Sequence, residues 1–179
     1  MRLAERFKLP VVCMIDTPGA FPGIGAEERN IAEAIAFNLK EMMNLKTPVI
    51  ACVLGEGGSG GALGIGVADR VMMMENAYYS VISPEGCAAI LWKHRQHAPE
   101  AAEAMKIAAP DLGKLNLIDE VIPEPRGGAH HDHVKSATNF RDAVLAQIKQ
   151  VQSLSTEDML DQRYQKFRKF GEWNGDAIA

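Results

Sequence analysis

The stretch VIACVLGEGGSGG, residues 49–61, decides how this chain folds. Its first part, residues 49–54, is apolar and rich in β-branched side chains, which is typical of a buried strand. Its second part is mostly glycine and leads into the small apolar stretch 62–68, where we expect a short helix. Backbone N–H groups at a helix start lack internal partners and favour negative charge. The stretch therefore predicts a place where bare backbone binds a phosphate, a tetrahedral oxyanion or an enolate oxygen.

Length and composition limit the classes of protein to which the chain can belong. Its 179 residues, 47% of them hydrophobic, suit a single domain over residues 1–179 with a sizeable core. The net charge of -4 argues against binding to nucleic acid or an anionic membrane, and favours small-molecule or protein partners. No apolar run reaches the roughly 20 residues of a membrane span and no signal peptide is visible, so we expect a soluble, cytoplasmic protein.

The cysteines give a second indication of the compartment. Cys13, Cys52 and Cys87 are odd in number and lie in apolar runs. This pattern favours reduced, packed thiols in a cytosol over a disulfide framework.

Strand and helix patterns alternate along the chain, which indicates an α/β fold. We expect strands at 11–15, 49–54, 71–74, 78–82 and the end of 112–122, and helices at 1–9, 27–45, 62–68, 84–92, 98–108 and 140–151. Ser155 with Asp158 resembles a capping box and predicts a last helix within a C-terminal helical extension, residues 134–179. Its aromatic stripe, Tyr164, Phe167 and Phe170, serves either core packing or a subunit contact.

The glycine run matches the dinucleotide-binding pattern GxGxxG over residues 55–60, and Glu75 follows at a suitable distance. However, the helix expected after the glycines has room for only about two turns, whereas a dinucleotide-binding unit needs a full crossover helix. We therefore disfavour a dinucleotide site.

Residues 57–61 also match GxSxG, the nucleophile elbow of α/β-hydrolases. Asp119 and His130 follow Ser59 in the chain order of that triad. Against this, the glycines around Ser59 suit close backbone approach to a ligand equally well, and His130 lies in a polar loop. A serine hydrolase or peptidase that uses Ser59 stays open as an alternative.

Two weaker patterns indicate structure more than chemistry. Residues 16–19 match the DxxG switch of GTPases, but no GxxxxGK[ST] loop is present to bind phosphates. Residues 130–133, His-His-Asp-His, are possible metal ligands, yet adjacent ligands on an irregular loop rarely converge. We expect a tight turn at the first, and a polar surface loop without a metal at the second.

Six motifs in consistent order, spanning residues 1 to about 171, resemble one known family. They are AERFK at 4–8, IDTPGA at 15–20, GAEER at 25–29, the glycine run at 55–61, SVISPEGC at 80–87, and PEP with GGAH at 123–125 and 127–130. This combination is similar to the carboxyltransferase alpha subunit of bacterial acetyl-coenzyme A carboxylase. The resemblance implies a crotonase-like ββα spiral fold with C-terminal helices. Members of that family have a longer N-terminal part, so a bare sheet edge and exposed apolar surface are expected here.

The resemblance also implies a reaction. A carboxyl group passes from carboxybiotin, borne by the biotin carboxyl carrier protein, to acetyl-CoA, which gives malonyl-CoA for fatty acid synthesis. Fixed N–H groups suit this chemistry because they stabilise developing oxyanions without reorganisation. By the family pattern, the N–H groups of Gly60 and Gly61 form the oxyanion hole facing biotin, and a beta subunit with a zinc ribbon forms the one for the thioester. A Cβ at either glycine is expected to collide with the ligand or to tilt the amides.

Further site residues and partners follow from the same resemblance. The expected substrate-binding residues are Gly57, Gly58, Ser59, Ala20, Phe21, Pro22 and Gly23, the last four forming either a wall of the biotin pocket or a structural turn. Lys93, His94 and Arg95 either meet coenzyme A phosphates or form a solvated helix end. The implied partners are the beta subunit, the carrier protein and biotin carboxylase, in an alpha2beta2 hetero-oligomer. A non-catalytic role as an assembly partner of the beta subunit is a further alternative.

Overall fold

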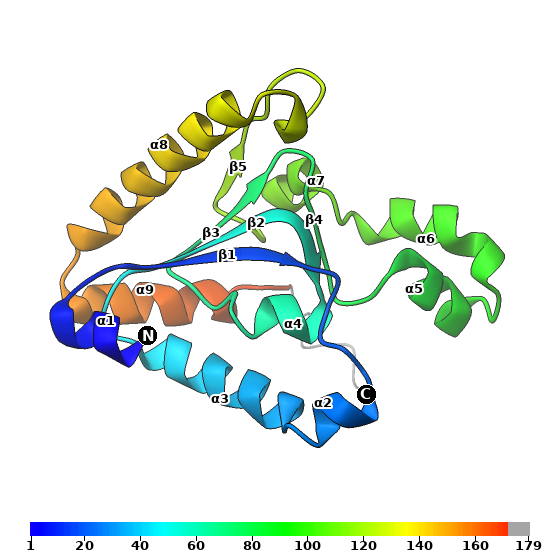
Figure 1. Ribbon diagram of the computed structural model, residues 1–179, viewed down its shortest axis with the longest axis horizontal. Helices are drawn as coiled ribbons and strands as arrows, with labels where there is room; N and C mark the ends of the chain where they lie inside the picture. The colour runs from blue at the N-terminus through cyan, green and yellow to red at the C-terminus, as the bar shows by residue number, and fades with distance from the viewer. Residues whose placement is uncertain (172–179) are drawn as a thin grey trace, which may run out of the picture.

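A parallel β-sheet with helices on both faces forms the centre of the computed structural model, which describes residues 1–171 (Figure 1). Its strands are β1 (Val11–Thr17), β2 (Val49–Gly58), β3 (Arg70–Met74), β4 (Tyr78–Ser80) and β5 (Glu120–Ile122). The order is β1-β2-β3-β5, and β4 pairs separately with β2. Residues 49–53 of the central strand are completely buried, because a parallel sheet is covered on both faces. The α/β prediction is therefore confirmed.

The helices form two layers and one projecting arm. They are α1 (Arg2–Phe7), α2 (Ile24–Glu27), α3 (Ile31–Asn44), α4 (Ser59–Leu63), α5 (Pro84–Leu91), α6 (Ala98–Met105), α7 (Ala109–Lys114), α8 (His133–Gln152) and α9 (Thr156–Arg168), with 3-10 turns η1 (Arg95–His97) and η2 (Ala129–His131). Figure 1 shows α8 on one face of the sheet, α3, α4 and α9 on the other, and the α5–α6 pair standing away from the body. Among the described residues, no helix is long and apolar enough to cross a membrane.

Several helix boundaries differ from the expectation. The long helix predicted at 27–45 begins only at Ile31, with the short α2 before it, because Asn30 adopts a left-handed conformation with φ of 57°, which asparagine tolerates well. Helix α8 begins at His133 instead of residue 140, since the Asp132 carboxylate accepts a hydrogen bond from the N–H of Lys135. Helix α7 was not expected. The predicted cap of α9 is confirmed: Ser155 Oγ accepts from the N–H of Asp158 at 3.1 Å.

Strand β2 is longer than predicted and changes partner along its length. It continues through the first glycines to Gly58, so the helix begins at Ser59 and not at residue 62. Up to Val53, β2 lies between β1 and β3. From Glu56 onward, β4 takes the place of β3, while β1 stays on the other side. The change occurs at a bulge, where residues 54–56 of β2 oppose Asp16 alone on β1.

Asp16 stabilises this bulge. Its Oδ1 accepts a hydrogen bond of 2.9 Å from the N–H of Glu56. Beside it, the Thr17 hydroxyl lies 3.2 Å from both the N–H and the carbonyl oxygen of Gly19, which closes the turn after β1. The residues that matched a GTPase switch are therefore structural, as expected.

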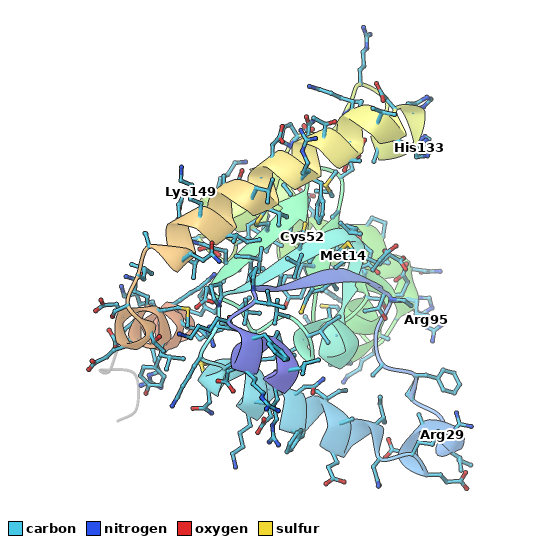
Figure 2. The ribbon with its side chains drawn as sticks, turned by 60° about the vertical axis from the view of Figure 1, so that its left-hand side comes forward. Met14, Arg29, Cys52, Arg95, His133 and Lys149 are labelled. Carbon is cyan, nitrogen blue, oxygen red and sulfur yellow. The ribbon has the colours of Figure 1, made fainter. Side chains whose placement is uncertain are left out.

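Strand β1 lies at the edge of the sheet, since among the described residues it pairs only with β2. Its side chains Val12 and Met14 are 38% and 61% exposed. Figure 2 shows Met14 close to Cys52, with α8 crossing the sheet above them. The expected bare edge and exposed apolar surface are thus confirmed for the part of the chain that the structure describes.

A buried arginine joins α9 to the end of the sheet at which β2 and β3 begin. The Arg163 side chain on α9 is fully buried and forms a two-pronged ion pair with Asp69, both contacts being 2.8 Å. It also donates to the carbonyl oxygens of Met42, Leu45 and Thr47 at 2.7, 2.8 and 3.1 Å, which satisfies backbone acceptors at the end of α3. We call this group the α9 anchor.

All three cysteines are free thiols, as predicted. Cys52 is completely buried in β2, and burial raises the pKa of its thiol to about 12. This thiol packs in the hydrophobic core and stays protonated at neutral pH.

Candidate active site

The short helix α4 presents two backbone donors at the end of β2 that have no partner among the described residues. Gly58 is its N-cap, and no side chain in that part of the chain caps the helix. Gly60 and Gly61 are its second and third residues, so their N–H groups precede the first hydrogen bond within the helix. Paired, fixed N–H groups of this kind suit an oxyanion.

The loop after β1 packs directly against these glycines. A Cβ at Gly58 would lie 2.0 Å from the carbonyl oxygen of Pro18, and one at Gly61 would lie 2.7 Å from the carbonyl carbon of Gly19. Glycine at both positions is therefore required by close backbone contact. A Cβ added at Gly60 would lie 3.4 Å from Ile35 Cδ1. The first obstacle to a side chain at Gly61 is thus the loop backbone, which agrees with the expectation that a Cβ there would tilt the amides.

Ser59, between the strand and the glycine donors, has an unusual backbone conformation. Its φ of 48° lies in the left-handed region, which residues with a Cβ seldom adopt. Its side chain is exposed and borders two cavities, one on each side. Strain of this kind concentrates at functional sites, where the surrounding structure enforces it.

The first of these cavities, which we call the apolar cavity, has a volume of about 260 Å³. Its lining includes Gly60, Leu63, Tyr79, Leu112, Leu117 and Phe170. Burial raises the pKa of the Tyr79 phenol, so the hydroxyl is neutral at physiological pH. A compact apolar group fits this environment, with its polar end directed toward the N–H groups of α4.

The second cavity, of about 300 Å³, brings together part of the predicted substrate-binding set. Ala20 and Pro22 from the loop after β1 line it together with Gly58 and Ser59. Tyr78 lines it too, and burial and the adjacent Glu56 carboxylate raise the pKa of its phenol.

Three residues of the predicted substrate-binding set lie outside both cavities, and so does the predicted donor Gly61. The Phe21 side chain is 74% exposed, and its ring covers the position that a Cβ on Gly23 would take, 2.2 Å from the nearest ring carbon. Gly57 is buried beneath the ring of Tyr79, whose Cδ2 would lie 2.9 Å from an added Cβ. Gly57 and Gly23 thus shape the backbone around the cavities.

The geometry does not support the hydrolase alternative. The Asp119 carboxylate accepts hydrogen bonds from the N–H of Val71, at 2.6 Å, and from Lys166 Nζ. His130 lies on η2 beside His131, with ring centres 4.4 Å apart and the planes tilted by 42°. Across the described part of the chain, no hydrogen bond joins any two of Ser59, Asp119 and His130, so no triad is assembled.

The remaining charged candidates lie away from the α4 donors. Lys93, His94 and Arg95 are exposed at the turn between α5 and α6, and His94 Nδ1 accepts from the N–H of Gln96, so both interpretations of these residues stay predictions. Within residues 1–171, no group of three or more His, Cys, Asp or Glu side chains is arranged to hold a metal ion.

Sequence reasoning missed two residues of this region. Phe170 was assigned to core packing or a subunit contact, but it lines the apolar cavity. Tyr79, in the segment expected to be a plain strand, lines the same cavity. Neither position carries a local signal, because the cavity forms only when β4, α7 and the end of α9 come together.

Comparison with solved structures defines the class of fold. The chain superimposes on a subunit of transcarboxylase 12S with a TM-score of 0.69 and 21% identity, covering 84% of this chain and 29% of that one. A Pseudomonas malonate decarboxylase hetero-tetramer, solved in complex with coenzyme A, gives a TM-score of 0.66 at 18% identity, covering 87% and 61%. The predicted crotonase-like fold is therefore confirmed.

Sequence comparison identifies the family within that class. Residues 1–171 match the family described as acetyl co-enzyme A carboxylase carboxyltransferase-like, and the chain belongs to this family. Two similar relatives are the acetyl-coenzyme A carboxylase carboxyl transferase alpha subunits of Rhodopirellula baltica, 56% identical, and Edwardsiella ictaluri, 58% identical, each aligned over 171 residues and 96% of this chain. The chain spans 54% of the length of each of these relatives.

Proposed function

We propose that this chain forms the alpha-subunit half of a carboxyltransferase that moves a carboxyl group from carboxybiotin to acetyl-CoA, producing malonyl-CoA for fatty acid synthesis. The family match over residues 1–171 carries the proposal. The uncapped N–H groups of Gly60 and Gly61 beside an apolar cavity support it, because the chemistry needs fixed donors at a developing oxyanion.

In this proposal the chain positions and polarises, and supplies no nucleophile. Carboxybiotin, bound through its carrier protein, supplies the transferable carboxyl group. The N–H groups of Gly60 and Gly61 bind the ureido oxygen, while Leu63 and Leu112 keep water out of the cavity, which strengthens those hydrogen bonds. Gly58 and Ser59 hold the donors in place against the loop that contains Ala20 and Pro22.

The partners in this proposal are a beta subunit with a zinc ribbon, the biotin carboxyl carrier protein and biotin carboxylase, with the two carboxyltransferase subunits in an alpha2beta2 assembly. The beta subunit would supply the thioester half of the site, which leaves this chain silent alone. The three free thiols support a reducing compartment such as the cytoplasm. We also propose that residues 1–179 form one domain whose helical extension comprises residues 134–179.

The test is the reverse reaction, decarboxylation of malonyl-CoA with biocytin as the carboxyl acceptor. The 179-residue chain is assayed alone, mixed with the beta subunit, and against the beta subunit alone. We expect turnover only in the mixture. Binding of the beta subunit without turnover would favour the assembly-partner alternative, and absence of both would contradict the proposal.

A fluorophosphonate probe separates the hydrolase alternative. Because no histidine among residues 1–171 is hydrogen-bonded to Ser59, we expect no labelling of this residue. Labelling at Ser59 that Ser59→Ala abolishes would support hydrolysis instead.

A further inference from the structure

The last helix reaches the candidate active site through the residue that follows it. Helix α9 ends at Arg168, and Phe170 comes immediately after its C-cap. The Phe170 side chain is 37% exposed and forms part of the lining of the apolar cavity, which Gly60 also lines. A segment more than a hundred residues downstream of the glycine run therefore closes a wall beside its donors.

Contacts of Phe167 and Lys166, near the end of α9, hold both this helix and Phe170 in position. The ring of Phe167 packs against the hydrophobic core and meets the ring of Phe170 edge to face, with centres 5.4 Å apart and planes at 75°. This is a favoured geometry for aromatic pairs. Lys166, one residue earlier, pairs with the Asp119 carboxylate and donates to the carbonyl oxygen of Asp69 at 3.2 Å.

The α9 anchor fixes the helix one turn further back. The Arg163 guanidinium has Asp69 and four backbone carbonyls as partners, so any shift of α9 along its axis would break several buried hydrogen bonds together. The residue that forms this wall thus directly follows a helix whose position is fixed.

We propose that Phe170 is a specificity-determining residue: its ring sets the size of the apolar part of the ligand whose oxygen binds at Gly60. This inference rests on the proposed function, in which that apolar part is the bicyclic ring of biotin. The Phe170 ring and the glycine donors have different roles. The donors bind the reacting oxygen, whereas the ring excludes water and limits the volume of the apolar cavity. Truncation of Phe170 therefore weakens binding of the biotin compound and leaves the thioester half of the reaction unchanged.

The test uses the complex of the 179-residue chain with the beta subunit and the reverse reaction with biocytin. We expect Phe170→Ala to raise KM for biocytin about tenfold and to leave KM for malonyl-CoA within about twofold. Phe170→Leu, which keeps most of the apolar volume, should restore most of the affinity. Tyr164→Ala is the matched control, because Tyr164 is an aromatic residue of α9 that is 51% exposed and lines neither cavity.

Two results would overturn the inference while leaving the proposed function intact. One is a KM for biocytin unchanged by Phe170→Ala, and the other is an equal rise with Tyr164→Ala. Equal changes of both KM values in Phe170→Ala would likewise show a merely structural role. Calorimetric titration of each complex with biocytin checks that the KM differences reflect binding.

If the unaltered complex neither turns over nor binds biocytin, the proposed function fails. The role of Phe170 in setting the size of the apolar cavity is then tested with a different ligand. The probe is then the dye 8-anilinonaphthalene-1-sulfonate, which binds apolar cavities. We expect Phe170→Ala to change its dissociation constant by at least about threefold, and Tyr164→Ala to leave it unchanged. Equal dye affinities in all three proteins would overturn the inference.

Discussion

The two ends of strand β2 differ sharply in how completely their polar groups are satisfied. At the amino end, the N–H of Val49 donates to the Asp69 carboxylate at 2.7 Å, and Asp69 pairs with Arg163. At the carboxyl end, Ser59 is strained, and α4 starts without a side-chain cap. One strand thus connects a buried, fully paired region to an exposed region with free donors.

This difference shows how the molecule combines rigidity with binding. Free N–H groups and a strained backbone cost stability, and they persist only where surrounding structure enforces them. The α9 anchor and the buried part of β2 supply that support at a distance from the chemistry. Changes at the amino end should therefore act on stability, and changes at the carboxyl end mainly on activity.

The largest effect is expected from breaking the amino end. Arg163→Met removes the cation from a buried pair, leaves the Asp69 carboxylate with the hydrogen bond from the N–H of Val49, and takes one donor from each of four backbone carbonyl oxygens. We expect a loss of about 3–5 kcal/mol in the free energy of unfolding, measured by urea denaturation. Arg168→Met, an exposed arginine on the same helix, is the control and should cost less than about 0.5 kcal/mol. Similar losses in both variants would show that the buried pair adds nothing.

At the carboxyl end, Gly61→Ala should reduce activity more than stability. Its Cβ forces the loop at Gly19 to move, so we expect a loss of about 1–3 kcal/mol in unfolding and a fall of about a hundredfold in turnover of the complex. At Gly25, within α2, an added Cβ meets nothing within 4 Å, so Gly25→Ala should leave turnover unchanged and should not destabilise the fold. Full turnover in Gly61→Ala would contradict the role of the α4 donors.

A change at the bulge tests the connection between the two ends. Asp16→Ala removes the acceptor for the N–H of Glu56, and we expect unfolding to become easier by about 1 kcal/mol. Asp16→Asn keeps an acceptor oxygen and should recover most of this loss. Asp142→Asn, at an exposed ion pair on α8, controls for the change of charge. Equal stability of Asp16→Ala and the unaltered protein would rule out a role for this contact.

The smallest effect concerns a carboxylate in the loop after β5. Burial opposes the charge on Glu124, but hydrogen bonds from the N–H groups of Asn76 and Ala129 and the nearby His130 outweigh it and lower the pKa of this carboxyl. Because the pKa is lower in the folded state, the stabilisation is present above about pH 4.3 and disappears as the pH falls through the lowered value.

Glu124→Gln should therefore cost about 0.5–1 kcal/mol at pH 7, where an amide cannot accept from both N–H groups. The difference from the unaltered protein should vanish in the acid range below about pH 4.3. Urea denaturation at several pH values measures it, and a difference independent of pH would contradict this account.

The outcome for individual residues shows what local sequence encodes. The buried run 49–53 and the cap at Ser155 were predictable, because burial and capping are encoded by adjacent residues. Gly60 and Gly61, in contrast, were assigned as donors through the family resemblance. The bulge in β2 was not, since it depends on pairing with Asp16, distant in sequence. The cavity wall at Phe170 was missed for the same reason: an aromatic repeat fixes a helix face but not what that face meets.

The α9 anchor also constrains the order in which the chain acquires its structure. Asp69 and Arg163 are 94 residues apart, and Arg163 reaches the carbonyl of Met42 across 121 residues. During synthesis the amino-terminal strands emerge first, and Asp69 is then a carboxylate without its cation in a forming interior. Closure of such long loops is slow, so the sheet should stay loosely packed until α9 arrives. A ribosome-bound chain stalled before residue 163 is thus expected to be protease-sensitive, and one stalled well after it resistant.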